Sequence, residues 1–302
     1  MKTLTIITTT YNRAYCIGQV YESLKRQDCD DFCWLVVDDG STDNTREVIQ
    51  GFIDEGIIDI TYIYQPNKGM TGARNTAYEA CRTELNTIID SDDWLADGAV
   101  RKIIDFWRAN RRDDLAGIIA LDVNPKGAVI GTPLPEDIAE TTMMELFGKF
   151  KARGDKKLIY RSDISRKYPY PEIPGENFFP PSYKFYQIDK THKMLLLNES
   201  ICVVDYNDDS MSFDKIAQYR RCPVGFALYY NLTQDIYPNM TKRLKNGLMY
   251  IALSRLKKEK GIIKKSRRKI QTVILYPIGI LLSHYIRKTK KKAFSVPKII
   301  HN

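Results

Sequence analysis

Three acidic residues follow directly behind an apolar run in the stretch Thr87-Ile-Ile-Asp-Ser-Asp-Asp-Trp94. A carboxylate buried without a partner is costly, so Asp90, Asp92 and Asp93 are expected to face a cleft, a cation or the amino terminus of a helix. Oxygen-only ligands of this kind suit a hard divalent ion such as Mg²⁺ or Mn²⁺. Capping of the following helix is the alternative for Asp93, and it leaves Asp90 and Asp92 unexplained.

A second acidic group follows the apolar run Cys33–Val37, in the sequence Asp38-Asp39-Gly40-Ser41-Thr42-Asp43. An acid at the end of a strand can accept hydrogen bonds from the imide of a nucleobase or from a ribose hydroxyl. A turn followed by a helix cap is the alternative, because Asp, Gly and Ser are common turn residues. The motif is therefore only moderately informative by itself.

Glycines and an arginine mark a third stretch, Asn67-Lys68-Gly69-Met70-Thr71-Gly72-Ala73-Arg74-Asn75. Gly69 and Gly72 allow the backbone to approach a ligand closely, and the amide groups at a helix amino terminus attract anions. Arg74 would lie one turn into the helix, within reach of a phosphate or of the acidic residues at 90–93. A solvated surface arginine is the alternative for Arg74 taken alone.

Strand-like and helix-like segments alternate along the first 120 residues, which predicts βαβ units and an α/β fold with a mostly parallel sheet. Ligands bind beyond the carboxyl ends of the strands in such sheets. Three polar clusters, at 9–13, 38–41 and 90–93, fall at these ends and should converge. The strands are expected at Leu4–Thr10, Cys33–Val37, Ile58–Tyr64 and Leu85–Ile89, and the helices at Gly18–Arg26, Thr71–Cys81, Asp97–Asn110 and from Asn44 onward.

The composition indicates a folded protein with an uneven distribution of charge. Hydrophobic residues make up 43% of the 302 residues, which is enough for a substantial core. The six cysteines form no CxxC pair and no secretion signal opens the chain, so reduced thiols in a cytoplasmic protein are expected. Residues 241–302 hold 18 lysines and arginines and one acid, Glu259, whereas the remainder holds 28 basic and 36 acidic residues.

The basic C-terminal region predicts attachment to an anionic membrane surface. Its apolar block at 273–282 is shorter than the roughly 20 apolar residues that span a bilayer. Basic clusters at 264–269 and 287–292 flank this block, an arrangement that favours anionic lipids. Solvated helices that face water are the alternative.

The three clusters together resemble glycosyltransferase family 2, whose members have the nucleotide-sugar-binding GT-A fold. The likeness is close over about residues 1–110 and loose beyond. It implies a GT-A domain over about 1–235, with a nucleotide-sugar half at about 1–120 and an acceptor half at about 121–235. The change to helix formers and basic residues predicts a basic helical tail over 236–302. The matching residues, in the family's order and at its usual spacing, are Thr9-Thr10-Tyr11-Asn12-Arg13, Val37-Asp38-Asp39-Gly40-Ser41-Thr42-Asp43, Asn67-Lys68-Gly69, Ala73-Arg74-Asn75 and Asp90-Ser91-Asp92-Asp93-Trp94.

The resemblance also implies roles for individual residues. Thr9, Tyr11 and Asp39 would hold the base, expected to be uracil. Arg13 and Arg74 would lie near the phosphates or support the acidic cluster. The whole nucleotide-sugar site would comprise Thr9, Tyr11, Arg13, Asp39, Lys68, Gly69, Arg74, Asp90, Ser91 and Asp92.

The resemblance also implies that the site binds a divalent cation. Asp92 matches the last acid of the family's DxD motif and would hold Mn²⁺ or Mg²⁺. Asp90 would bind the ribose or the donor sugar and act as a secondary metal ligand. The ion would neutralise the diphosphate leaving group.

Transferases of this kind typically invert the anomeric centre by direct displacement, so a carboxylate must take the proton of the acceptor hydroxyl. The family usually places this base downstream, often as Glu-Asp near an aromatic residue. Asn177 stands here where an Asp is often found, so Glu176 is the expected base, and a surface glutamate in a proline-rich loop is the alternative. The competing acids are Asp163, Asp189 and Asp205.

The prediction is therefore an inverting, metal-dependent transferase of hexosyl or N-acetylhexosaminyl groups. It would use a nucleotide donor, expected to be a UDP-sugar, and a glycan or lipid-linked acceptor in bacterial surface polysaccharide synthesis, on the cytoplasmic face of the cell membrane and without a nucleic-acid partner. A nucleotidyltransferase is the alternative enzyme, but the loop at 9–13 lacks the glycines that such enzymes need. A polyanion-binding or nucleic-acid-binding protein is less favoured, because the body of the chain is acidic.

Overall fold

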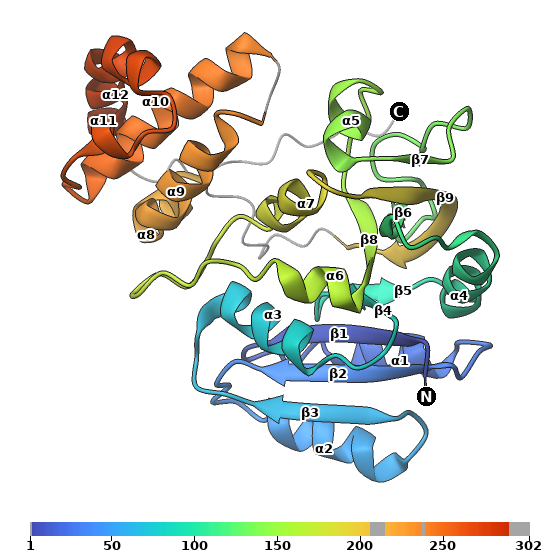
Figure 1. The fold of residues 1–302 in the computed structure, drawn as a ribbon. Coiled ribbons are helices and arrows are strands. Elements are labelled where there is room, and N and C mark those ends of the chain that lie inside the picture. Colours follow the sequence, from blue (N-terminus) through green and yellow to red (C-terminus); the bar gives the residue numbers. More distant parts are fainter. Residues whose placement is uncertain (1, 206–214, 237–238, 290–302) are drawn as a thin grey trace, which may run out of the picture. The chain divides into compact units, whose positions relative to one another are not determined.

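The computed structural model describes residues 2–205, 215–236 and 239–289 of the chain. The chain forms two compact units. The first unit comprises Met1–Glu172 and Pro181–Asn207, and the second comprises Ile173–Pro180 and Asp208–Asn302. Figure 1 labels the helices and strands of both units. Each unit has a hydrophobic core of its own, so each is described by itself.

One half of the sheet in the first unit consists of parallel strands in the order β3-β2-β1-β4. β1 pairs with β2 from Leu4 opposite Phe32 to Thr10 opposite Asp38, so both strands end at the same level. The loops that follow them must therefore leave the sheet side by side. The elements of this half are β1 (Leu4–Thr10), α1 (Gly18–Lys25), β2 (Phe32–Asp38), α2 (Thr45–Glu55), β3 (Ile60–Tyr64), α3 (Gly69–Ala80) and β4 (Leu85–Ile88).

The other half of the sheet is mixed and continues in the order β8-β6-β9-β5, with β7 paired to β9. β8 runs antiparallel to both β4 and β6, and β9 runs parallel to β6 and antiparallel to β5 and β7. The elements of this half are β5 (Trp94–Leu95), α4 (Ala99–Asn110), β6 (Leu115–Val123), β7 (Glu140–Thr141), α5 (Met143–Gly148), β8 (Lys156–Arg161), α6 (Ser162–Lys167), α7 (Ser182–Ile188) and β9 (Lys193–Val203).

Aromatic side chains anchor the parallel strands to their helices. Tyr21 of α1 stacks on Phe52 of α2 with ring centroids 4.0 Å apart, and on Trp34 of β2 at 6.2 Å. The indole Nε1 of Trp34 donates a hydrogen bond to Thr8 Oγ1 at 3.0 Å, so its polar edge is satisfied inside the core. Close packing of this kind resists deformation, and the strand ends therefore form a rigid base for the loops beyond them.

Helices make up most of the described part of the second unit, and its segment Ile173–Pro180 forms no helix or strand. Its core includes Phe226, Met249, Ile251 and Leu275. The close approach of α12 to α10 depends on Gly279, because a Cβ atom at this position would lie 2.4 Å from Cγ2 of Ile251. The helices are α8 (Lys215–Arg221), α9 (Pro223–Thr233), α10 (Met240–Leu256), α11 (Ile262–Lys265) and α12 (Lys269–Lys288).

The predicted α/β fold with parallel strands in the N-terminal half is confirmed, and each predicted strand and helix of residues 4–110 is present within three residues of its expected ends. Helix capping by Asp93 is not observed, because α4 begins at Ala99 behind Gly98, whose φ of 70° is in the left-handed region. The predicted domain limit at 235 stays a prediction, although α8 and α9 belong to the second unit. Within the described residues, no helix is long and apolar enough to cross a membrane.

Candidate functional site

Asn12 joins the loop after β1 to the loop after β2. Its backbone N–H donates to Ser41 Oγ at 2.8 Å, and its Oδ1 accepts from the N–H groups of Thr42 at 2.7 Å and Asp43 at 3.3 Å. Asn12 has φ 53°, and asparagine tolerates this left-handed conformation better than most residues. The first two polar clusters predicted from the sequence therefore meet at one end of the sheet.

The two acids at the end of β2 have different surroundings, although both are buried. Asp38 accepts from Ser41 N at 2.8 Å with Oδ1 and from the Tyr62 hydroxyl at 2.7 Å with Oδ2. Asp39 uses Oδ1 for two bonds, from Gln65 Nε2 at 2.7 Å and from the backbone N–H of Lys68 at 2.8 Å. Burial raises the pKa of Asp39, and the Lys68 amide and the Gln65 side chain oppose that shift.

The hydrogen bond from the Lys68 amide to Asp39 joins the third predicted stretch, residues 67–75, to the end of β2. Lys68 and Gly69 lie at the start of α3, and Gly69 has φ 76°, a conformation that favours glycine. The packing around Gly72 also requires a glycine, since a Cβ atom there would lie 2.5 Å from the Cβ of Lys68. The amino-terminal turn of α3 is therefore held against Asp39, beside the strand ends.

Arg74 of α3 connects that helix to the acidic cluster behind β4. Its Nη2 lies 2.9 Å from Oδ1 of Asp90, and its side chain is largely buried, with 10% of the surface exposed, whereas Asp90 is half-exposed. The alternative of a solvated surface arginine is therefore wrong. An arginine held in this way keeps one carboxylate oriented and leaves the second oxygen of Asp90 for another partner.

The wall beside Arg74 contains a buried ammonium group. Lys184 Nζ donates to the carbonyl oxygens of Ser165 and Tyr168, both at 2.7 Å, and lies 3.9 Å from the ring centroid of Tyr78. Burial, together with the charge of Arg74, lowers the pKa of Lys184 to about 7. The two carbonyls and the ring face together satisfy Lys184, so this residue fixes the wall that supports Arg74.

Asp92 is half-buried and lies close enough to Arg13 for the two charges to attract each other. It makes no hydrogen bond or ion pair with the residues that the structure describes. Ser91 is buried between the two acids, and Thr9 and Tyr11 lie at the same end of the sheet, Thr9 opposite Val37 and Tyr11 with 48% of its surface exposed. The predicted site residues of the first unit are thus brought to one edge of the sheet.

The donor set fits a divalent cation that shares its ligands with a diphosphate. In residues 2–205, 215–236 and 239–289, no group of three or more His, Cys, Asp or Glu side chains could enclose a metal ion. Asp92 nevertheless offers a carboxylate that has no partner among the described residues, two positions after Asp90 in the chain. A hard ion such as Mg²⁺ often keeps one or two carboxylates and takes its other oxygens from substrate phosphates and water.

Sequence reasoning missed a buried charge cluster behind the acidic turn. Lys157 Nζ of β8 lies 3.6 Å from Oδ1 of Asp122 and donates to the carbonyl oxygen of Ile88 at 3.3 Å. The pKa of Asp93 is raised to about 7, mainly by burial and further by the neighbouring acids Asp90, Asp92 and Asp122, with Lys157 opposing the shift. Asp122 follows the apolar run 118–121 in the way that Asp90 follows its strand, and this signal could have identified it.

Glu176 lies in the second unit, where it binds the start of α9. Oε1 accepts from the backbone N–H of Val224 at 2.8 Å, and Oε2 accepts from that of Gly225 at 2.7 Å. Two of the competing acids also have structural partners: Asp189 accepts from Met143 N and Met144 N at the start of α5, and Asp163 pairs with Arg161 at 2.9 Å. The role of Glu176 as a base stays a prediction.

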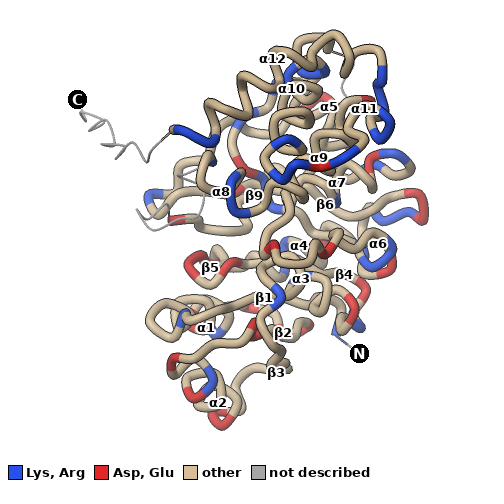
Figure 2. Tube along the Cα trace, turned by 90° about the vertical axis from the view of Figure 1, so that its left-hand side faces the viewer, with Lys and Arg blue, Asp and Glu red and all other residues tan. Residues whose placement is uncertain are grey.

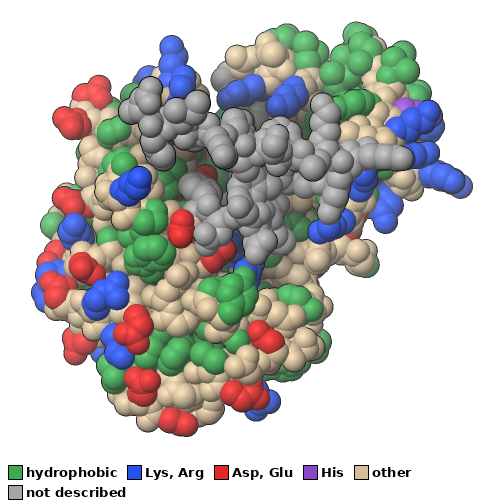
Figure 3. Space-filling model, turned by 180° about the vertical axis from the view of Figure 1, so that it is seen from behind, with side chains coloured by type: hydrophobic (Ala, Val, Ile, Leu, Met, Phe, Trp, Pro, Cys, Tyr) green, Lys and Arg blue, Asp and Glu red, His purple; other side chains and the backbone are tan. Residues whose placement is uncertain are grey.

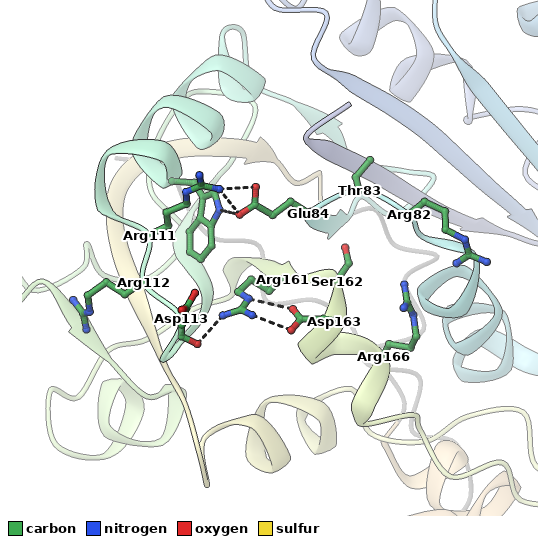
Figure 4. A pocket seen from close by; sticks show the side chains of 11 residues that line it. Arg82, Thr83, Glu84, Arg111, Arg112, Asp113, Arg161, Ser162, Asp163 and Arg166 are labelled. Atoms are coloured by element: carbon green, nitrogen blue, oxygen red, sulfur yellow. Dashed lines mark hydrogen bonds and ion pairs between the residues drawn. The ribbon is translucent and has the colours of Figure 1, made fainter. Parts of the chain in front are cut away.

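A pocket of about 670 Å³ lies at the opposite end of β4, away from the acidic turn. Figure 4 shows its charged side chains pairing with one another: Arg111 with Glu84, and Arg161 with Asp163. None of the residues predicted for the nucleotide-sugar site lines it. We therefore assign it no part in the chemistry of the strand ends.

A family model described as "Glycosyl transferase family 2" matches residues 5–164, just over half of the chain. An uncharacterized glycosyltransferase, alr2836, of Nostoc sp. is 28% identical over 172 residues, which are 54% of this chain and 52% of that protein. A GalNAc(5)-diNAcBac-PP-undecaprenol beta-1,3-glucosyltransferase of Campylobacter jejuni is 30% identical over 106 residues, 34% of each chain. The chain spans about half, or less, of the length of the curated relatives that it matches.

Solved structures with the same fold cover nearly the whole chain. A crystal structure of S. aureus TarS residues 1–349 in complex with UDP-GlcNAc has a TM-score of 0.60 at 16% identity, covering 95% of this chain and 87% of that one. The mannosyltransferase PcManGT from Pyrobaculum calidifontis, in complex with GDP-Man and Mn²⁺, has a TM-score of 0.54 at 14% identity, covering 94% and 81%. The GT-A fold expected from the sequence is confirmed.

Proposed function

The chain belongs to glycosyl transferase family 2, and we propose that it transfers a sugar from a nucleotide-sugar donor to a hydroxyl group of a glycan or lipid-linked acceptor in bacterial surface polysaccharide synthesis. One observation carries the proposal. Asp92, a carboxylate with no hydrogen bond or ion pair to a described residue, raises the pKa of Arg13 by its charge and lies two residues after Asp90, which Arg74 holds at 2.9 Å. A diphosphate with a bound cation matches these groups, because a carboxylate can bind the cation and arginines can bind the phosphate oxygens.

UDP is the proposed nucleotide. Asp39 accepts two hydrogen bonds on Oδ1, and a carboxylate has about four acceptor positions. The imide N–H of uracil would donate to one of the positions that are left. Thr9 and Tyr11 would contact the base from the end of β1. The UDP-GlcNAc complex of the similar TarS structure supports this choice of nucleotide.

Mn²⁺ or Mg²⁺ is the proposed cofactor, with Asp92 as its ligand and Asp90 as a secondary one. Bound there, the ion would supply neutralisation of the charge that develops on the leaving diphosphate. Arg74 orients Asp90 before a ligand arrives, and the charge of Arg13 acts on Asp92 without a hydrogen bond to it. The Mn²⁺ complex of the mannosyltransferase PcManGT supports the choice of ion.

Direct displacement with inversion is the proposed chemistry, and Glu176 is the proposed base for the acceptor hydroxyl. The two backbone amides at the start of α9 occupy two of the acceptor positions of its carboxylate, which leaves others for a hydroxyl group. The amides would fix the orientation of Glu176, which general-base catalysis requires. Capping of α9 alone is the competing role, and the two roles predict different effects of substitution.

Cytoplasmic location at the inner face of the cell membrane is part of the proposal. A lipid-linked acceptor is confined to a membrane, and the basic residues at 241–302 would hold the enzyme near an anionic surface. The Campylobacter jejuni relative, whose name specifies an undecaprenol-linked acceptor, supports this class of acceptor.

A donor screen tests the function directly. Hydrolysis of UDP-, GDP- and CDP-sugars by the purified protein would be measured with Mn²⁺, with Mg²⁺ and with a chelator. We expect release of UDP from one or a few UDP-hexoses or UDP-N-acetylhexosamines, in the presence of a divalent ion only. Turnover of a nucleoside triphosphate with release of pyrophosphate would instead identify a nucleotidyltransferase.

A further inference from the structure

Helix α12 has one face that is packed inside the second unit. Its buried residues recur at intervals of three and four, which places them on one side of a helix with 3.6 residues per turn. Gly279 is at the centre of this face, in close approach to Ile251 of α10. The buried residues of α12 are Thr272, Leu275, Gly279, Ser283 and Ile286.

The opposite face of α12 carries large apolar side chains that no described residue covers. Five of them recur at intervals of three and four, with Val273 beside this series, so they form a continuous stripe along about four turns, which we call the α12 stripe. Single exposed apolar residues are ordinary on a protein surface, but a continuous apolar patch marks an interaction site. The α12 stripe consists of Ile270 (80% exposed), Val273 (53%), Ile274 (69%), Ile278 (54%), Leu281 (70%) and Tyr285 (60%).

Basic residues stand at both ends of the α12 stripe. Lys264 and Lys269 at one end, and Arg287 and Lys288 at the other, are exposed and have no ion-pair partner in the described part of the chain. Figure 2 shows Lys and Arg at α11 and at the ends of α12, and Figure 3 shows hydrophobic side chains gathered over this helical region with basic side chains along its edge. Within 239–289 the single acid, Glu259, is already paired with Lys265 at 2.7 Å.

We propose that α12 lies flat on an anionic lipid bilayer, with the α12 stripe inserted at the level of the headgroups and the basic residues on lipid phosphates. This inference deepens the membrane association included in the proposed function, by assigning it to one face of one helix. An amphipathic helix with an apolar face and basic flanks binds membranes in this orientation. The other face of α12 stays packed on its own unit, so the helix binds the membrane without leaving its place in the fold.

A second copy of the chain is the other possible occupant of the α12 stripe, and charge argues against it. The exposed basic residues at the two ends have the same sign. Two copies that paired through this face would bring those residues together in either orientation, and like charges in an interface are unfavourable. Anionic lipids complement them instead, which is why we commit to the bilayer.

Co-sedimentation of the full chain with vesicles tests the proposal. Vesicles of pure phosphatidylcholine and vesicles with about 30% phosphatidylglycerol would be compared, the latter at low and high salt. We expect the protein to pellet with the anionic vesicles and less so at high salt, since ionic strength screens the basic residues. The double substitution I274S/L281S should lower the partition coefficient by about tenfold or more, because two inserted apolar side chains are removed.

The matched control is Ile57→Ser, which changes a residue of the first unit that is 57% exposed. It should leave vesicle binding unchanged. Thermal melting and hydrolysis of the donor in solution should be the same for all three proteins, so a failure of the proposed function cannot be mistaken for a failure of this inference. The inference is overturned if I274S/L281S binds anionic vesicles as tightly as the parent chain, or if it loses only a self-associated species in size-exclusion chromatography.

Discussion

The strand-end loops of the first unit and the helix α12 of the second unit leave different kinds of side chain without a partner. In the loops, several polar groups have hydrogen bonds within the fold, as for Asn12, Asp39 and Arg74. Among the acids of the site, Asp92 has no hydrogen bond or ion pair with the described residues, so the group that stands out there is a charge. In α12 the uncovered groups are apolar, and they form the α12 stripe. The comparison teaches that each region is incomplete in one respect, and that the missing partner has a different chemistry in each.

Removal of the charge of Asp92 is expected to have the largest effect. Asp92→Asn keeps the shape of the side chain and removes the charge that a hard cation requires, so sugar transfer should fall by about 10³-fold or more. Asp97→Asn is the matched control, because Asp97 is exposed and forms a surface ion pair with Arg26 at 3.3 Å. Steady-state rates with limiting Mn²⁺ would measure both. A wild-type rate for Asp92→Asn would show that the uncompensated charge has no role.

Glu176→Gln separates the two roles of that residue. If Glu176 is the general base, the substitution should lower kcat by about 10²–10⁴-fold and leave UDP binding and the melting temperature nearly unchanged. As a cap alone, its loss should lower the stability of the second unit by about 1 kcal/mol and leave the activity of the folded protein intact. Initial rates, a UDP titration and a thermal melt of the same preparation distinguish these outcomes.

Lys157→Met tests whether the buried charges behind the acidic turn form one unit. Removal of one partner of a buried pair leaves an uncompensated charge, so unfolding free energy should fall by about 3–5 kcal/mol at pH 8. Without the lysine, Asp93 and Asp122 would have pKa values raised still further above those of the unfolded chain. The stability of the variant then falls as pH rises from the unfolded to the folded pKa values of these acids. The loss of unfolding free energy caused by Lys157→Met should therefore be smaller at pH 5 than at pH 8.

Lys102→Met is the control for Lys157→Met. Lys102 forms an exposed pair with Glu199 at 2.8 Å, and such surface pairs contribute about 0–1 kcal/mol. Urea unfolding at pH 5 and pH 8 would measure both variants. Equal and pH-independent losses would mean that Lys157 acts by packing alone.

The two faces of α12 should differ in their response to small changes. Gly279→Ala should destabilise the second unit by about 1–3 kcal/mol, because the added Cβ would overlap with the buried Ile251. Ile278→Ala, at the preceding residue, should change stability by about 0.5 kcal/mol or less, since this side chain is 54% exposed. Thermal melts of the two variants would sharpen the contrast, and equal effects would mean that α12 is packed on both sides.

The sequence was sufficient to predict what depends on local pattern. The apolar runs placed β1, β2 and β4, and the polar residues at their ends identified the acidic turn at 90–93 and the pair at 38–39. Parallel strands that share a register must bring these ends together, which is why the convergence could be foreseen. The apolar block of α12 was also visible, but its division into a buried and an exposed face was not, because Gly279 and Ser283 give no apolar signal.

Other features depend on contacts between residues far apart in the chain. Lys157 meets Asp122 and the acidic turn only because β8 inserts antiparallel between β4 and β6. Lys184 reaches the rings beside Arg74 from a helix about 110 residues away, and no local pattern marks it. The two hydrogen bonds of Glu176 to α9 span 48 and 49 residues of sequence. The resemblance to the family could therefore propose Glu176 as a base, but the local sequence could not predict its place at a helix start.

The most direct test of the central claim is a calorimetric titration of UDP into the parent chain and into Asp92→Asn, each with and without Mn²⁺. The claim is that the free carboxylate at the strand ends binds a diphosphate through a divalent ion. We predict that UDP binds the parent chain in the presence of Mn²⁺, that a chelator weakens this binding by about tenfold or more, and that Asp92→Asn shows the weak binding in both conditions. Binding of UDP that is equally tight in all four experiments would contradict the account.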